Sequence, residues 1–227
     1  MFLDGVPLHW MKDWPMPHLP LVEKAHGAVI EDIDGHKIDD FCLGDTGSMF
    51  GHSPAPVAKA IRHQARRGLT YMLPTEEALE AGRLLSQTFG PMRWQIATTA
   101  TDANRFAIRV ARGVTGRPKI LVFNGCYHGT VDDAMVELAN GVTQNRQGLM
   151  GQVADLTLGA TCVEFNDLAA VEAALAKGDV AAILTEPVMT NSCMVLPDAG
   201  FHDGLRQLSL KYGALLIMDE THTISSG

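Results

Sequence analysis

GALLIMDETHT, residues 213–223, shows most directly how this chain folds. Five apolar residues, Ala214–Met218, lead straight into Asp219 and Glu220. An apolar run of this length fits a buried strand. A charge that leaves water needs a partner, or it costs several kcal/mol. The two acids therefore either reach solvent at the end of the strand or meet a cation there.

Similar apolar runs occur upstream, with helix-like stretches between most of them. The runs are WQIAT (94–98), ILVFN (120–124), CVEF (162–165), VAAILTEP (180–187) and ALLIMDE (214–220). The helix-like stretches are 102–112, 168–177 and 202–212. This alternation predicts an α/β fold, a largely parallel sheet with helices on both faces. Ligands of such sheets bind outside the carboxyl ends of the strands, where Asp219 would lie.

Residues 1–53 do not show this alternation of strands and helices. Residues 1–20 hold Pro7, Pro15, Pro17 and Pro20, which predicts an extended arm. Asp34-Gly35 between two short β-like runs predicts a small hairpin. We therefore expect an arm and hairpin segment over residues 1–53 and a second domain over residues 54–227.

Composition narrows the class of protein. The net charge of −8 disfavours nucleic acid and anionic membranes as partners. The four cysteines are far apart and form no C-x-x-C, which favours free thiols in a reducing compartment. No apolar run approaches the roughly 18 residues of a membrane span, and the first residues do not resemble a signal peptide. We expect a cytoplasmic location.

Four polar patches follow predicted strands: 98–105, 124–130, 185–191 and 218–223. The first precedes a predicted helix, whose free N–H groups can hold a phosphate. Its Thr101 could equally be a simple N-cap. Neither glycine-rich nucleotide fingerprint is present. Asp219 and His222 make at most half a metal site, so no metal is predicted.

Taken in order, these patches resemble the class III aminotransferases of the fold-type I pyridoxal-phosphate (PLP) family. The branch most similar contains glutamate-1-semialdehyde aminomutase. The matching stretches are DFCLGDTGSMFGHSP (40–54), TATDANRFAIRVARGVTGRPKILVFNGCYHG (99–129), TEPVMTN (185–191) and GALLIMDETHT (213–223). The resemblance implies a homodimer and makes residues 54–227 an incomplete PLP-binding large domain.

The resemblance also implies roles for residues around the cofactor. Asp219 matches the acid that keeps the pyridine nitrogen protonated. Tyr127 matches the aromatic ring that stacks on the cofactor, with His128 in the same loop. Ala100 and Thr101 match positions that hold the phosphate.

Four further residues match positions near the cofactor or substrate. Glu186 matches a glutamate near the site, and Asn191 matches a side chain at the ring edge. His222 lies where a side chain approaches the ring's 3-oxygen, and an imidazole could donate to it. Ser48 is a candidate substrate contact, although a structural turn residue is the simpler interpretation.

Some features depart from the family. Its Ser-Gly-Thr-Glu-Ala is Thr-Ala-Thr-Asp-Ala at residues 99–103, and its valine after Asp-Glu is Thr221. The lysine that forms the Schiff base lies well downstream of the ring-nitrogen acid, and no lysine of this chain matches it. We therefore expect a fragment of a longer enzyme, inactive alone.

Three functions remain open. The first is an aminotransferase, which passes an amino group from an amino donor to an oxo acceptor. The second is an aminomutase, which exchanges amino group and oxygen on one carbon skeleton. The third is a catalytically inactive PLP-binding or interaction fragment.

Overall fold

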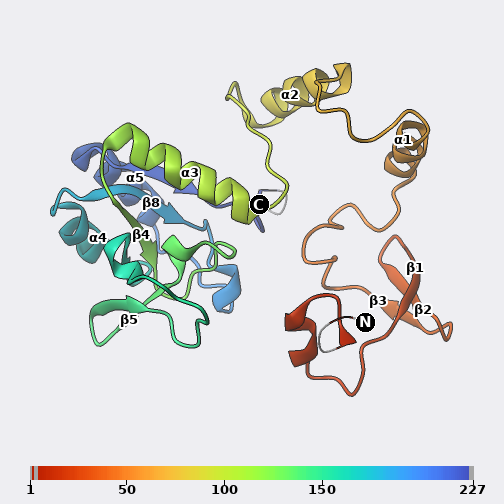
Figure 1. The fold of residues 1–227 in the computed structure, drawn as a ribbon, viewed down its shortest axis with the longest axis horizontal. Coiled ribbons are helices and arrows are strands. Elements are labelled where there is room, and N and C mark those ends of the chain that lie inside the picture. The colour runs from red at the N-terminus through yellow and green to blue at the C-terminus, as the bar shows by residue number, and fades with distance from the viewer. Residues whose placement is uncertain (1, 3–4, 225–227) are drawn as a thin grey trace. The chain divides into compact units, whose positions relative to one another are not determined.

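The computed structural model describes residues 2 and 5–224. Contacts within the chain divide it into two compact units, Met1–Leu84 and Leu85–Gly227, and each is described by itself (Figure 1). The sequence predicts a domain boundary between residues 53 and 54. That position falls inside the first unit, and the boundary stays a prediction.

The first unit contains a small antiparallel sheet, with strand order β1-β2-β3. Its strands are β1 (Val22–His26), β2 (Val29–Asp32) and β3 (Lys37–Asp39). The turn between β2 and β3 carries Gly35 at φ +82°, which confirms the predicted Asp34-Gly35 hairpin. Asp32, Asp34 and His36 lie close together in this turn. The Asp32 carboxylate already accepts hydrogen bonds from Asp34 and His36, so the cluster is explained as turn structure.

The helices of the first unit bury little. They are the 3-10 helix η2 (His9–Asp13), α1 (Ala55–Ala65) and α2 (Glu76–Phe89), which runs into the second unit. The expected extended arm thus contains the short helix η2. None of the residues of α1 and α2 is buried in the described structure. Apolar side chains such as Ile61 and Leu79 stay largely exposed.

The second unit is built on a four-stranded parallel sheet with strand order β7-β4-β8-β9. The strands are β4 (Lys119–Phe123), β7 (Ala160–Val163), β8 (Val180–Thr185) and β9 (Leu215–Met218). Every residue of β8 is buried, so both faces of the sheet centre are covered. The predicted α/β fold is confirmed.

Three helices cover this sheet (Figure 1). They are α3 (Ala100–Thr115), α4 (Leu168–Leu175) and α5 (Phe201–Tyr212), at the predicted places. The α3 N-cap is Thr99, whose side chain accepts a hydrogen bond from Asp102 N at 3.1 Å. The alternative that Thr101 is the N-cap is therefore wrong. Gly213, at φ +64°, ends α5 and turns the chain into β9.

Two segments differ from the predictions. Residues 94–98 form no strand, because no chain segment among the described residues pairs with them. A hairpin of β5 (Val136–Ala139) and β6 (Val142–Asn145) was not predicted, although Asn140-Gly141 is a strong turn signal. The described part of this unit also contains the 3-10 helices η3 (Asp132–Ala134), η4 (Leu156–Leu158) and η5 (Thr190–Ser192).

Two expectations from composition can be compared with the structure. Cys42, Cys126, Cys162 and Cys193 are free thiols, as expected. Within the described part of the chain, no helix combines the length and apolar character needed to cross a membrane.

The centre of the sheet is the place to test the packing. Ile183 on β8 is completely buried between β4 and β9. Ile183→Ala should lower the free energy of unfolding of the full-length protein by about 2–5 kcal/mol, because it leaves a cavity. The matched change Ile183→Val should cost only about 0.5–1.5 kcal/mol. Urea unfolding followed by circular dichroism measures both, and equal losses would contradict this packing.

Candidate functional site

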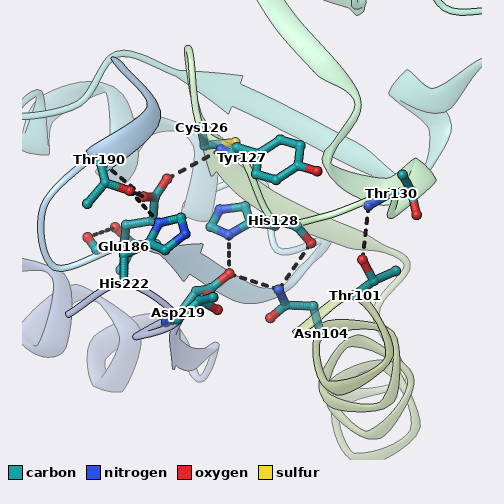
Figure 2. Close-up of polar contacts among 12 residues, drawn as sticks. Thr101, Asn104, Cys126, Tyr127, His128, Thr130, Glu186, Thr190, Asp219 and His222 are labelled. Carbon is teal, nitrogen blue, oxygen red and sulfur yellow. Dashed lines mark hydrogen bonds and ion pairs between the residues drawn. The ribbon is translucent and has the colours of Figure 1, made fainter. Parts of the chain in front are cut away.

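Polar side chains gather at the carboxyl ends of β4, β8 and β9 (Figure 2). Tyr127 and His128 lie in the loop after β4, Glu186 follows β8, and Asp219 follows β9. The start of α3 contributes Thr101. The parallel sheet brings these segments to one edge, which is where such folds bind ligands.

Asp219 occupies the centre of this group. Its Oδ2 accepts hydrogen bonds from His128 Nδ1 and from Asn104 Nδ2, both at 2.8 Å. Its Oδ1 accepts from Thr221 N at 3.1 Å and from the Thr221 hydroxyl at 2.5 Å. The His128 side chain is 0% exposed and that of Asp219 is 7% exposed. The buried acid at the strand end therefore finds its cationic partner in His128.

The pKa values agree with an ion pair. Burial lowers the pKa of His128, but the bond to Asp219 and the neighbouring Cys126 outweigh it and raise that pKa to about 9. Burial raises the pKa of Asp219, and the hydrogen bonds from His128, Thr221 and Asn104 outweigh this effect and hold the pKa well below its usual range. Both shifts favour an imidazolium beside a carboxylate at neutral pH.

The start of α3 forms a second part of the site. The backbone N–H groups of Ala100 and Thr101 have no acceptor among the described residues. Thr101 Oγ1 accepts from Thr130 N at 3.2 Å. Gly129, at φ +79°, lies so close that a Cβ there would overlap Thr101 Oγ1. This helix start, with free donors and a positive dipole end, can hold an anion.

Glu186 links the β4 loop to the segment after β9. It is buried, its Oε1 accepts from Tyr127 N at 3.3 Å, and its Oε2 accepts from Thr190 N and Thr190 Oγ1, both at 3.1 Å. Thr190 Oγ1 also lies 2.7 Å from His222 Nδ1. Tyr127 as a residue is 47% exposed, so solvent and a flat ligand can reach it.

The two remaining predicted residues have surroundings of their own. Asn191 lies in η5 beside Thr190, but its side chain is exposed and makes no hydrogen bond to any described residue. Ser48 belongs to the first unit, where its hydroxyl lies 3.3 Å from His52 Nδ1. His52 Nε2 in turn lies 2.7 Å from Asp40 Oδ2.

Two contributors were missed from the sequence. Asn104 was not singled out, although an amide on a buried helix face needs partners and is therefore a signal. It bonds Asp219 and, at 3.2 Å, the His128 carbonyl. Thr190 stands inside the quoted TEPVMTN but carries no pattern of its own, because its role depends on the fold of η5.

The His128–Asp219 pair predicts how stability depends on pH. A raised folded pKa adds stability below the unfolded value of about 6.5 and loses it as pH rises through about 9. The unfolding free energy of the full-length protein should therefore fall over this range. His128→Asn, which can still donate to Asp219 but cannot titrate, should lack this fall. Denaturant unfolding of both proteins at stepped pH measures this. If the unfolding free energies of wild type and His128→Asn changed in parallel with pH, the ion pair would be contradicted.

The chain matches a known protein family over almost its whole length. The family model described as "Aminotransferase class-III" matches residues 11–225. Over 206 residues the chain is 38% identical to glutamate-1-semialdehyde 2,1-aminomutase 2 of Lysinibacillus sphaericus (strain C3-41). That match covers 89% of this chain and 48% of the relative.

Solved structures agree with this match. A glutamate-1-semialdehyde-aminomutase from Pseudomonas aeruginosa PAO1 superposes with a TM-score of 0.96 at 53% identity, over 100% of this chain and 50% of that one. A lysine-to-alanine variant of a glutamate-1-semialdehyde-aminomutase from the same organism was solved in complex with PMP, with a TM-score of 0.95, 53% identity and the same coverage. An omega-transaminase from Sphaerobacter thermophilus gives 0.85 at 26% identity, over 95% of this chain and 52% of that one.

The chain spans about half the length of the relatives it matches. The family model nevertheless covers almost all of the chain itself. This protein chain belongs to the class III aminotransferase family.

Proposed function

We propose that the protein is a PLP-dependent aminotransferase, which transfers an amino group from an amino donor to an oxo acceptor. The observation that carries this proposal is the ionised Asp219 at the carboxyl end of β9, in one site with the anion-binding start of α3. Membership of the class III family supports it. The PMP complex of the Pseudomonas aeruginosa relative supports the cofactor class.

Five residues of this site have roles in holding the cofactor. The N–H groups of Ala100 and Thr101 bind its phosphate, and Tyr127 offers its exposed ring face for stacking. Asp219 accepts from the pyridine nitrogen and keeps it protonated, while His128 keeps Asp219 ionised. When bound, PLP supplies an electron sink for the bond changes at the substrate.

The hydrogen-bond capacity of Asp219 is a test of this fit. A carboxylate has about four acceptor positions, and His128, Asn104 and the two Thr221 donors fill them. A pyridinium N–H therefore has to replace one donor. Thr221 is exposed, so its hydroxyl can turn to solvent and leave Oδ1 to the ligand. The site fits PLP through this exchange.

The remaining residue assignments rest on the family resemblance. Glu186 holds the Tyr127 loop, Asn191 lies at the ring edge, and His222 approaches the 3-oxygen. Ser48 remains a proposed substrate contact from the first unit.

Partners and location remain proposals of the same kind. The substrates are a small amino donor and a small oxo acceptor, and the protein works as a cytoplasmic homodimer. Residues 1–227 alone would be inactive, because no lysine in them matches the lysine that binds the cofactor in the family.

A second candidate is the intramolecular exchange of an aminomutase. The relatives at 53% and 38% identity are named glutamate-1-semialdehyde aminomutases, whereas the omega-transaminase is 26% identical. An aminomutase needs one substrate that carries both groups, whereas an aminotransferase needs two substrates.

Asp219→Asn tests the cofactor site. The change removes a charge-assisted hydrogen bond worth about 1.5–3 kcal/mol, so PLP affinity of the full-length protein should fall by ~10- to 100-fold. Asp203→Asn, an exposed acid on α5, is the matched control and should not change it. Titration followed by cofactor absorbance gives both affinities. Equal affinity in wild type and Asp219→Asn would sink the assignment.

Substrate supply separates the two reactions. We expect the full-length protein with PLP to form a new amino product only when an amino donor and an oxo acid are both present. Chromatography of the products, with each substrate alone and with both, makes the measurement. Turnover of glutamate-1-semialdehyde alone, without any second substrate, would establish the aminomutase instead.

A further inference from the structure

The first unit holds three side chains in a line of hydrogen bonds. His52 stands in the middle: its Nε2 lies 2.7 Å from Asp40 Oδ2, and its Nδ1 lies 3.3 Å from Ser48 Oγ. The Asp40 side chain is 6% exposed and the His52 side chain is 19% exposed. An acid, an imidazole and a hydroxyl in this order form the arrangement that activates a serine as a nucleophile.

Asp40 decides the direction of these hydrogen bonds. Its Oδ1 accepts from Cys42 N at 2.9 Å and from Leu43 N at 3.0 Å, while its Oδ2 faces His52. The bond from His52, together with the two backbone donors, outweighs burial and holds the pKa of Asp40 below its usual value. An ionised carboxylate can only accept, so His52 Nε2 carries a proton and donates to Asp40.

The neutral His52 ring then has a lone pair at Nδ1, on the side of Ser48. Because Nδ1 carries no proton in this form, the Ser48 hydroxyl is the donor in the contact. The distance of 3.3 Å is longer than that of an optimal hydrogen bond. Contacts of this kind are often long without substrate and shorten when substrate binds. His52 is therefore placed to take the hydroxyl proton of Ser48.

The backbone before Ser48 is held in a strained form. Four consecutive residues, 43–46, have φ between +56° and +65°. Three of them, Leu43, Asp45 and Thr46, carry a side chain, which makes the left-handed conformation unfavourable. Ser48 N donates to Leu43 O at 2.7 Å and closes this turn. Strained backbone of this kind is concentrated at active sites.

Backbone donors follow the serine directly. Met49 N and Phe50 N have no acceptor among the residues that the structure describes. Acyl transfer develops negative charge on the carbonyl oxygen of the substrate, and backbone N–H groups stabilise it. The N–H group of the residue after a nucleophilic serine serves this purpose in the α/β-hydrolases. The segment thus carries a hydroxyl, a base and free donors for acyl transfer.

We propose that Ser48 is a reactive centre of its own, a nucleophile toward carboxylic esters, with His52 as its base and Asp40 as the positioning residue for His52. Ser48 Oγ forms a bond to the ester carbonyl carbon while its proton passes to His52 Nδ1. The bond from that carbon to the leaving alcohol oxygen breaks, and the alcohol takes the proton from His52.

Water releases the acyl group in a second step. Its oxygen bonds to the acyl carbon while His52 takes one of its protons. The bond from the carbon to Ser48 Oγ then breaks, and the proton returns to Oγ. One ester and one water give one acid and one alcohol, so the step needs neither an oxidant nor PLP. The inference does not rest on the proposed function.

The test is labelling of the full-length protein with a fluorophosphonate ester, followed by peptide mass spectrometry. Wild type should carry the adduct on Ser48. His52→Ala should slow this labelling by ~100-fold or more, because it removes the base. Ser53→Ala is the matched control and should label like wild type, since the Ser53 hydroxyl donates to Ala25 O instead. Wild type should also hydrolyse p-nitrophenyl acetate faster than Ser48→Ala does.

Asp40→Asn separates positioning from a structural role. Labelling should rise with pH as His52 loses its proton, and the midpoint should be lower in Asp40→Asn, which lacks the charge that favours the imidazolium. Asp39→Asn, an exposed acid on β3, should move the midpoint less.

Four results would each overturn the proposal. They are no adduct on Ser48 in wild type, equal labelling rates in wild type and His52→Ala, equal ester hydrolysis in wild type and Ser48→Ala, and an unchanged midpoint in Asp40→Asn. The first of these needs no variant to fold. An adduct on Ser48 in a protein that binds no PLP would leave this proposal standing while the proposed function fails.

Discussion

The buried contact of Asp219 with His128 and Asn104 is the constraint on which the rest of the site depends. It joins three segments that are distant in sequence: the end of β9, the loop after β4 and the second turn of α3. A buried carboxylate without a partner is costly, and removal of one member of a buried pair leaves the other charge exposed to that cost. The three segments are therefore held in one arrangement at the sheet edge.

The loop after β4 is fixed from more than one side. Asp219 and Asn104 hold the ring and the carbonyl of His128, while Glu186 accepts from the backbone of Tyr127. Tyr127 remains 47% exposed as a residue although its backbone is anchored. An exposed ring on a fixed backbone is suited to stacking, because little conformational entropy remains to be lost on binding.

The sequence predicted those parts of the fold that depend on local pattern. Apolar runs identified β4, β7, β8 and β9, and Asp219 was located because an acid directly after a buried strand conflicts with burial. The strand predicted at residues 94–98 does not form, because an apolar run forms a strand only beside another strand. Asn104 and Thr190 were missed because their partners, Asp219 and His222, come from distant parts of the chain. The periodicity of apolar residues in a sequence does not show which distant residues come into contact.

Thr221 departs from the family pattern, and its effect can be understood from the hydrogen bonds of Asp219. The resemblance places valine there, and a valine would leave one acceptor position of Asp219 Oδ1 without a donor. Here the Thr221 hydroxyl fills that position. The carboxylate is thus satisfied before a ligand arrives, and a ligand N–H has to displace a hydroxyl rather than fill a vacant position. The threonine thus competes with a ligand for Oδ1 from a position that is open to solvent.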